Sequence, residues 1–264
     1  MSDTLTIDTL SAGYGRRTVI SGVTLSPLAA GTVTVLAGPN GAGKSTLLRA
    51  VAGFLPASGI VKLCGRDLLT AKSADRARRV GFMPQALPGD VGLTVLDGVM
   101  TALKVSQPEC TVADARERAA SVLDRLGILP LALSRLGRLS GGQKQIASLA
   151  QALVADPRLL LLDEPVSALD LRHQYQVMRT VRSLAEEGRI VIVVLHDLEM
   201  ASRWADHIVI MRNGQLFGAG PPREVITPEM LREVYRVKAR VFVDNAIRIA
   251  IDDVVQETLR KDAR

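Results

Sequence analysis

Apolar residues recur along the chain with two periods, and the period changes from one stretch to the next. Short runs of alternating or consecutive apolar residues predict β-strands, because successive side chains of a strand point to opposite faces. Longer stretches with apolar residues every three or four positions predict α-helices. Strands are predicted at 5–10, 19–25, 32–37, 60–63, 80–83, 159–162, 190–195, 207–212 and 215–217, and helices at 44–53, 171–187 and 198–205. The alternation of strands and helices predicts an α/β sheet, with an antiparallel β edge formed by the glycine-broken strands at the start.

One block carries helical spacing alone and is predicted to be an inserted helical subdomain. It runs from Leu93 to about Asp156, after a loop rich in proline and glycine at 84–92 that marks a domain boundary. Beyond Pro221 the pattern predicts two short helices, a β segment at 241–251 and a charged helical tail at 252–264. We therefore expect a single domain over 1–264, with a core at 1–86 and 157–220, a helical subdomain at 87–156 and a C-terminal extension at 221–264.

A glycine-rich loop separates the strand at 32–37 from the helix at 44–53, and its spacing is that of a phosphate-binding loop. Glycines let the backbone curl around a phosphate, and the positive end of the following helix points at the same place. Lys44 supplies an ammonium to the β- and γ-phosphates, and the Ser45 hydroxyl is placed to ligate Mg²⁺. The loop consists of Gly38, Pro39, Asn40, Gly41, Ala42, Gly43, Lys44, Ser45 and Thr46.

Two further segments carry candidate chemistry. Asp163 and Glu164 follow a run of four leucines, so they are expected at the carboxyl end of a buried parallel strand, where open α/β sheets place their chemistry. A serine and two glycines precede the last helix of the helical block, which predicts a helix N-terminus with free N–H groups and a second anion site. The residues of this second segment are Ser140, Gly141, Gly142 and Gln143.

The amino-acid composition excludes several classes of function. Hydrophobic residues make up 47% of the chain, which excludes wholesale disorder, and aromatic residues make up only 3%, which argues against a stacking platform for single strands. The net charge of +6 is modestly basic, and no nucleic-acid partner is expected. Cys64 and Cys110 are expected to be free thiols in a reducing compartment. The start of the sequence lacks a signal-peptide pattern, and the apolar runs are too short to span a bilayer. If the protein acts at a membrane, we therefore expect a partner protein that spans it.

Taken together, these motifs resemble those of the nucleotide-binding subunits of ATP-binding cassette (ABC) transporters, over residues 5–220. The resemblance rests on seven segments in the family order: Tyr14, Gly38–Thr46 (Walker A), Gln85 (Q-loop), Leu139–Gln143 (signature), Asp163 with Glu164 (Walker B), 167–170 (D-loop) and His196 (switch histidine). From the residues alone Tyr14 is an ordinary loop tyrosine; the resemblance implies that it stacks on adenine. It also implies a P-loop NTPase fold, a RecA-like core with a mixed sheet and an inserted α-helical subdomain.

The resemblance further implies an ATPase that uses ATP and Mg²⁺. Ser45, Gln85 and Asp163 would hold the metal, and Lys44 would contact the phosphates. Glu164 would be the general base or would orient the attacking water, and His196 would hold that water and the γ-phosphate in line. The signature residues Ser140, Gly141, Gly142 and Gln143 would contact the ATP of another subunit. A second copy in a head-to-tail dimer is therefore an expected partner.

A finer similarity points to importers of iron(III)–siderophores, haem or cobalamin, and it lies in residues 169–174 and 227–235. Lys144-Gln145 follows the signature where Arg-Gln is common, and the segment 93–108 is less typical of that subgroup. Both departures bear on the substrate and leave the ATPase untouched. The resemblance implies a polytopic membrane permease, a solute-binding protein acting through it, and a place on the cytoplasmic face of the membrane. A soluble assembly ATPase of the iron–sulfur cluster type is the alternative. DNA-repair and translation ABC proteins are disfavoured, because neither a long coiled-coil insertion nor a second cassette is present.

Overall fold

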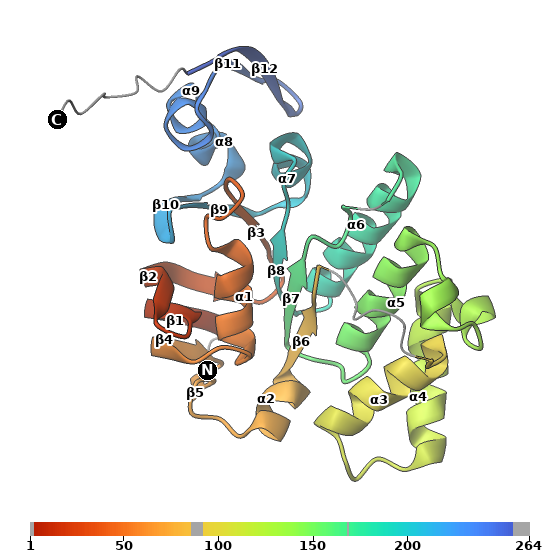
Figure 1. Ribbon diagram of the computed structural model, residues 1–264. Coiled ribbons are helices and arrows are strands. Elements are labelled where there is room, and N and C mark those ends of the chain that lie inside the picture. The colour runs from red at the N-terminus through yellow and green to blue at the C-terminus, as the bar shows by residue number, and fades with distance from the viewer. Residues whose placement is uncertain (1–2, 86–91, 168, 256–264) are drawn as a thin grey trace, which may run out of the picture.

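The central layer of the molecule is a six-stranded mixed sheet. The computed structural model describes residues 3–85, 92–167 and 169–255, and the sheet has the strand order β10-β9-β3-β8-β7-β6 (Figure 1). All neighbours are parallel except β9 and β10, which form an antiparallel hairpin. Its turn is Asn213-Gly214, a residue pair that favours tight hairpin turns. The strands are β3 (Val33–Ala37), β6 (Val80–Met83), β7 (Leu159–Asp163), β8 (Ile190–Val194), β9 (His207–Arg212) and β10 (Gln215–Gly220).

The antiparallel strands predicted at the start of the chain form a sheet of their own, in the order β2-β1-β4-β5. They are β1 (Thr4–Tyr14), β2 (Arg17–Ala29), β4 (Ala57–Leu63) and β5 (Arg66–Asp67). Helix α1 (Lys44–Ala52) lies between this sheet and the core sheet, and all three share one apolar cluster (Figure 1). The phosphate-loop helix is therefore packed on both sides.

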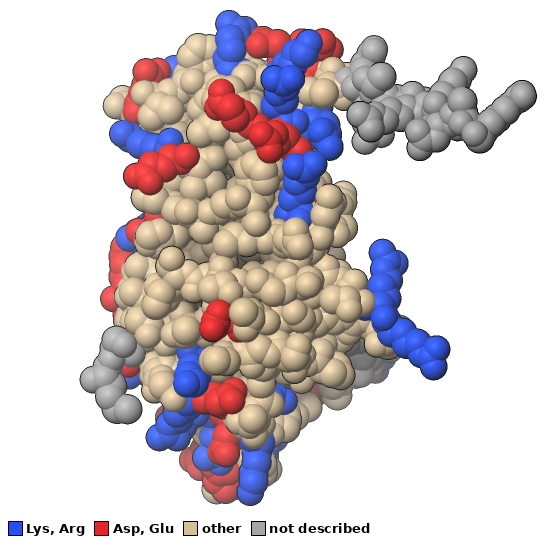
Figure 2. Space-filling view, turned by 90° about the vertical axis from the view of Figure 1, so that its left-hand side faces the viewer, with Lys and Arg blue, Asp and Glu red and all other residues tan. Residues whose placement is uncertain are grey.

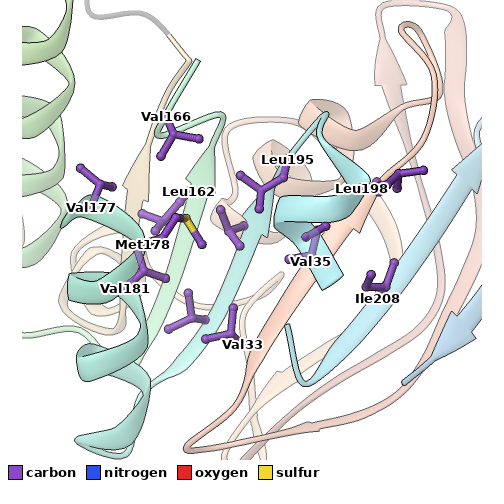
Figure 3. Packing of buried hydrophobic residues seen from close by; sticks show 14 of the residues in the cluster. Val33, Val35, Leu162, Val166, Val177, Met178, Val181, Leu195, Leu198 and Ile208 are labelled. Carbon is purple, nitrogen blue, oxygen red and sulfur yellow. The ribbon is translucent and has the colours of Figure 1, made fainter. Parts of the chain in front are cut away.

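The other face of the core sheet is covered by helices α6 (Leu171–Glu186) and α7 (Leu198–Trp204). Figure 3 shows Met178 and Val181 of α6 against Leu162, and Val35 near Leu198. Strand β7 explains the run of four leucines, since Leu160 and Leu162 face this cluster while Leu159 and Leu161 face the cluster around α1. A strand buried on both faces needs apolar residues at every position.

The inserted segment forms a helical subdomain with an apolar core of its own. Its helices are α3 (Val95–Ser106), α4 (Val112–Arg125) and α5 (Gly141–Leu153), with short 3₁₀ turns at Leu129–Leu131 and Leu136–Arg138. Helix α5 belongs to two clusters, because Ala147 and Ala150 pack inside the subdomain while Leu149 and Leu153 pack against the core sheet. Helix α5 therefore packs against both the helical subdomain and the core sheet.

The sequence pattern missed helix α2 (Ser73–Arg79), which has no buried residue and therefore no apolar period. The C-terminal extension consists of α8 (Pro222–Val225), α9 (Pro228–Met230), a π-helical turn (Leu231–Tyr235), β11 (Val237–Val243) and β12 (Ile247–Val254). The prediction of a helix from residue 252 is wrong for 252–254, because β12 continues through them in register with β11. Cross-strand ion pairs between Arg240 and Asp252 and between Lys238 and Asp253 stabilise that pairing. The rest of the predicted tail, 256–264, lies outside the described residues.

The surface gathers its charges unevenly. Figure 2 shows Lys, Arg, Asp and Glu concentrated near the C-terminal hairpin and at the opposite end of the molecule, with few charges between them and no broad Lys/Arg patch on this face. Within residues 3–85, 92–167 and 169–255, no helix combines the length and apolar character needed to cross a membrane.

Candidate active site

The phosphate loop leaves β3 and begins α1 in a conformation that requires glycine. Gly41 and Gly43 have φ angles of 78° and 99°, in the left-handed region. A side chain at Gly38 would place its Cβ 2.2 Å from the Met211 carbonyl oxygen, and one at Gly43 would come within 2.7 Å of Ile20. No side chain caps the start of α1, so its first N–H groups stay available to an anion.

Lys44 holds its ammonium inside the curve of this loop. The residue is 6% exposed, and Nζ donates hydrogen bonds to the carbonyl oxygens of Gly38 at 2.7 Å and Pro39 at 3.0 Å. Burial lowers the pKa of Lys44, while the negative charges of Glu164 and Asp163 raise it in part. The ammonium is therefore already positioned at the centre of the loop, where it would meet a phosphate.

Asp163 ends β7 beneath the loop and is fully buried. Its Oδ1 accepts a hydrogen bond from Ser45 Oγ at 3.0 Å, whereas Oδ2 is buried without a hydrogen-bond partner. Burial raises the pKa of Asp163, the Ser45 hydrogen bond lowers it, and the nearby Glu164 raises it further. A carboxylate oxygen without a partner beside a hydroxyl is a donor set that suits Mg²⁺ once phosphate oxygens are added. Among the residues described, no group of three or more His, Cys, Asp or Glu side chains forms a metal site by itself.

Glu164 faces the loop and is held at both carboxylate oxygens. Gln85 Nε2 donates to Oε2 at 2.8 Å, and His196 Nε2 contacts Oε1. These three residues follow β6, β7 and β8, which are adjacent and parallel, so their carboxyl ends meet at one edge. A cavity of about 520 Å³ separates them from the phosphate loop, and its lining includes residues 40–46. The arrangement places a carboxylate across the cavity from the glycine-rich loop.

Tyr14 and the signature segment lie away from this cavity's lining. Tyr14 ends β1 and is 46% exposed, and its hydroxyl accepts a hydrogen bond from Arg49 Nη1 at 3.1 Å. Its adenine role therefore stays a prediction. Ser140 caps α5 as predicted for a serine before a helix: its Oγ accepts from Gln143 N at 3.3 Å, and Gln143 Oε1 accepts from Ser140 N at 3.0 Å.

Residues 20–167 match the family described as "ABC transporter". The chain belongs to this family. Similar curated proteins include the hemin import ATP-binding protein HmuV of Bordetella bronchiseptica, which is 40% identical over 251 residues, with 90% of this chain and 94% of the relative covered. Another is the ferric enterobactin transport ATP-binding protein FepC of Escherichia coli, which is 35% identical over 241 residues, with 89% and 88% covered. The predicted alternative, a soluble assembly ATPase, is not favoured by these relatives.

Solved structures carry the same fold. A nucleotide-free ATP-binding cassette of an ABC transporter superposes with a TM-score of 0.77 at 24% identity, over 89% of this chain and 99% of that one. An inward-facing conformation of a putative metal-chelate type ABC transporter gives a TM-score of 0.77 at 23% identity, over 95% and 97%. The chain is thus an ATP-binding and ATP-hydrolysing subunit of an ABC importer, with a P-loop NTPase core and a helical insertion.

One residue of this ABC ATPase that the motif search passed over reaches the active-site segment. Gln145 is 7% exposed, and its Nε2 donates to Ser167 Oγ at 3.1 Å and to the Glu164 carbonyl oxygen at 3.4 Å. In the sequence it stands in the second turn of a predicted helix, between Lys144 and Ile146. The one available signal was a polar residue on the buried face of α5, next to Ile146 and Ala147.

Proposed function

We propose that this ABC ATPase drives the uptake of haem or an iron(III)–siderophore through a separate membrane permease. The observation that carries its ATPase chemistry is Glu164, held at both oxygens opposite the phosphate loop. Haem and a ferric siderophore are named because the curated relatives with high coverage import hemin or transport ferric enterobactin. In this proposal the permease binds the transported solute, and the described residues of this chain do not contact it.

In the proposed mechanism the loop binds the phosphates, and the strand ends position the water. Backbone N–H groups from Gly41 to Ser45 and the Lys44 ammonium neutralise the β- and γ-phosphates. Glu164 orients the attacking water and accepts its proton. His196 holds the carboxylate from one side and Gln85 from the other, so the base is fixed before the substrate arrives.

Mg²⁺ would be held by Ser45 Oγ and by the buried carboxylate of Asp163, with Gln85 beside them. The ion would neutralise charge on the β- and γ-phosphates. The unpartnered Oδ2 of Asp163 supports this assignment, because a buried carboxylate oxygen without a partner is costly unless it acquires one.

The working unit would be a head-to-tail dimer of this chain. Each cavity is lined by the phosphate loop and not by the signature residues of the same chain, so Ser140, Gly141, Gly142 and Gln143 are free to serve a second copy. A dimeric bacterial cassette has a TM-score of 0.73 at 25% identity to this chain, which supports the proposal. Tyr14 would contact adenine at the open side of the same site.

The dimer would work at the cytoplasmic face of the membrane, bound to a polytopic permease that receives its solute from a binding protein. The test is to solubilise membranes of the native host in mild detergent, purify the tagged chain, and measure its ATPase activity with what co-purifies. Recovery with a polytopic permease, and ATPase activity that rises when haem or a ferric siderophore is supplied with its binding protein, would support the proposal. Recovery from the soluble fraction alone would contradict it and favour an assembly ATPase.

A further inference from the structure

A buried glutamine joins the signature helix to the segment that carries the catalytic glutamate. Gln145 lies two residues beyond Gln143, the last residue of the α5 capping box, and its amide N–H group donates to Ser167 Oγ at 3.1 Å and to the Glu164 carbonyl oxygen at 3.4 Å. The Gln145 side chain is 7% exposed, so these hydrogen bonds compete little with water. Its Oε1 is buried without a hydrogen-bond partner, so both hydrogen bonds described for the side chain come from its donor end.

A second contact fixes the same two segments together. Gly142 is three residues before Gln145, so the two residues share one face of α5. A Cβ at Gly142 would lie 2.6 Å from Cδ2 of Leu169, so the first turn of α5 and the chain after Glu164 are already in close contact. The start of α5 therefore contacts Glu164 and Ser167 through two hydrogen bonds and Leu169 through close packing.

The backbone at Glu164 needs such support. Its φ angle is 54°, in the left-handed region that a residue with a long side chain seldom adopts. A strained conformation persists where the surroundings hold it. The Glu164 carbonyl accepts hydrogen bonds from the Ser167 N–H at 3.4 Å and the Ser167 hydroxyl at 3.3 Å, and Gln145 adds a donor from a different element.

We propose that Gln145 is a positioning residue that couples the signature helix of each subunit to the Glu164 of the same subunit. The inference rests on the proposed head-to-tail dimer. There, Ser140 to Gly142 face the ATP of the partner's loop while Glu164 serves the subunit's own loop. Binding of one ATP against the start of α5 is thereby transmitted through Gln145 to the base at the other site, and the two sites hydrolyse cooperatively.

The test compares Gln145→Met with the parent chain. Methionine keeps the length and apolar stem but cannot donate, so the link is lost while the volume is kept. We expect kcat for ATP to fall roughly tenfold. We expect the Hill coefficient for ATP to fall from near 2 to about 1, and the Kd of a fluorescent ATP analogue to stay within about twofold of the parent value. Gln176→Met, on the exposed side of α6, is the matched control and is expected to keep all three values.

Two results would overturn the proposal. One is a kcat and a Hill coefficient of Gln145→Met equal to those of the parent. The other is a parallel loss of thermal stability, ATP binding and turnover, which would make Gln145 a merely structural residue. If the methionine variant fails to fold, Ser167→Ala provides a second test, because it removes the Ser167 Oγ that accepts from Gln145 Nε2. This variant must lower the Hill coefficient without weakening ATP binding. The proposed ATPase function is tested separately: the parent must hydrolyse ATP and Glu164→Gln must not. If that holds while Gln145→Met keeps the parent's kcat and Hill coefficient, only the proposed coupling is contradicted.

Discussion

Glu164 has a backbone conformation that few residues other than glycine adopt, and this conformation aims its side chain. A φ angle of 54° at such a residue costs on the order of 1–3 kcal/mol. The cost is offset locally by hydrogen bonds from Ser167 and Gln145 to its carbonyl and from Gln85 to its carboxylate. The strained backbone and the hydrogen bonds that stabilise it are therefore both found at Glu164, the residue that we propose as the general base.

Asp163 gives a prediction in which stability and activity change in opposite directions. Burial raises its pKa, so the folded state binds a proton at a pH where the unfolded chain has released it. The carboxylate therefore destabilises the nucleotide-free protein at neutral pH. The penalty shrinks as the pH falls below the raised pKa of the folded state and vanishes below the pKa of the unfolded state. Asp163→Asn removes the charge and is expected to raise the Tm by a few degrees at pH 7 while abolishing Mg²⁺-dependent hydrolysis.

Differential scanning calorimetry without nucleotide checks the first half of this prediction, and its pH dependence provides the control. The difference in Tm between parent and variant should shrink toward acid pH, because the parent's carboxyl becomes neutral there. A variant that melts below the parent at pH 7 would show that the charged form of Asp163 is stabilising, contrary to the account.

Among the elements, the buried strands of the core could be predicted from sequence, whereas the two-residue strand β5 and the order of the strands could not. Leu159–Leu162 and 190–195 are apolar throughout because both faces of the sheet are covered. Nothing in those runs says that β8 lies between β3 and β7, which is what brings His196 to Glu164. That proximity was available through the family resemblance alone. Helix α2 was missed because every one of its residues is at least partly exposed.

Helix α5 supplies a prediction that separates capping from phosphate contact at Ser140. Alanine removes the oxygen that accepts from Gln143 N, so Ser140→Ala is expected to lower the free energy of unfolding by about 1 kcal/mol. Ser140→Asp keeps a capping oxygen and favours the helix dipole, so its stability should match the parent. Both variants should lose hydrolysis, the aspartate more completely because its charge repels the γ-phosphate of the other subunit. Urea unfolding and ATPase assays on the same preparations measure the two effects, and an active Ser140→Asp variant would rule out the phosphate contact.

At the scale of the whole molecule, the C-terminal extension is part of the main apolar core. Ile226, Met230, Leu231 and Val234 are buried in the cluster that also contains Val35 and Ile208 of the sheet. The sequence predicted a C-terminal extension at 221–264 made of two short helices, a β segment and a tail, without indicating what it packs against. The division of the chain at 221 stays a prediction, although the packing across it is continuous.

This packing predicts a large stability effect far from the nucleotide. Leu231→Ala is expected to lower the free energy of unfolding by about 2–4 kcal/mol. The Leu231 residue is only 3% exposed, so removing its side chain leaves a cavity in the apolar core. Leu133→Ala, at a leucine that is 78% exposed, is the matched control and should change stability by less than about 0.5 kcal/mol. Chemical denaturation measures both, and equal effects would contradict an integral extension.

We propose that Glu164 activates the water at a site that a second copy of the chain completes. The most direct measurement is light scattering after size-exclusion chromatography, with ATP and Mg²⁺ present, on parent and Glu164→Gln protein alongside an ATPase assay. Glutamine is nearly isosteric and cannot take the proton, so we expect ATP to stay bound, hydrolysis to fall by roughly 10²-fold or more, and a stable dimer to accumulate. A Glu164→Gln chain that hydrolyses ATP at the parent rate, or that stays monomeric with ATP bound, would contradict the account.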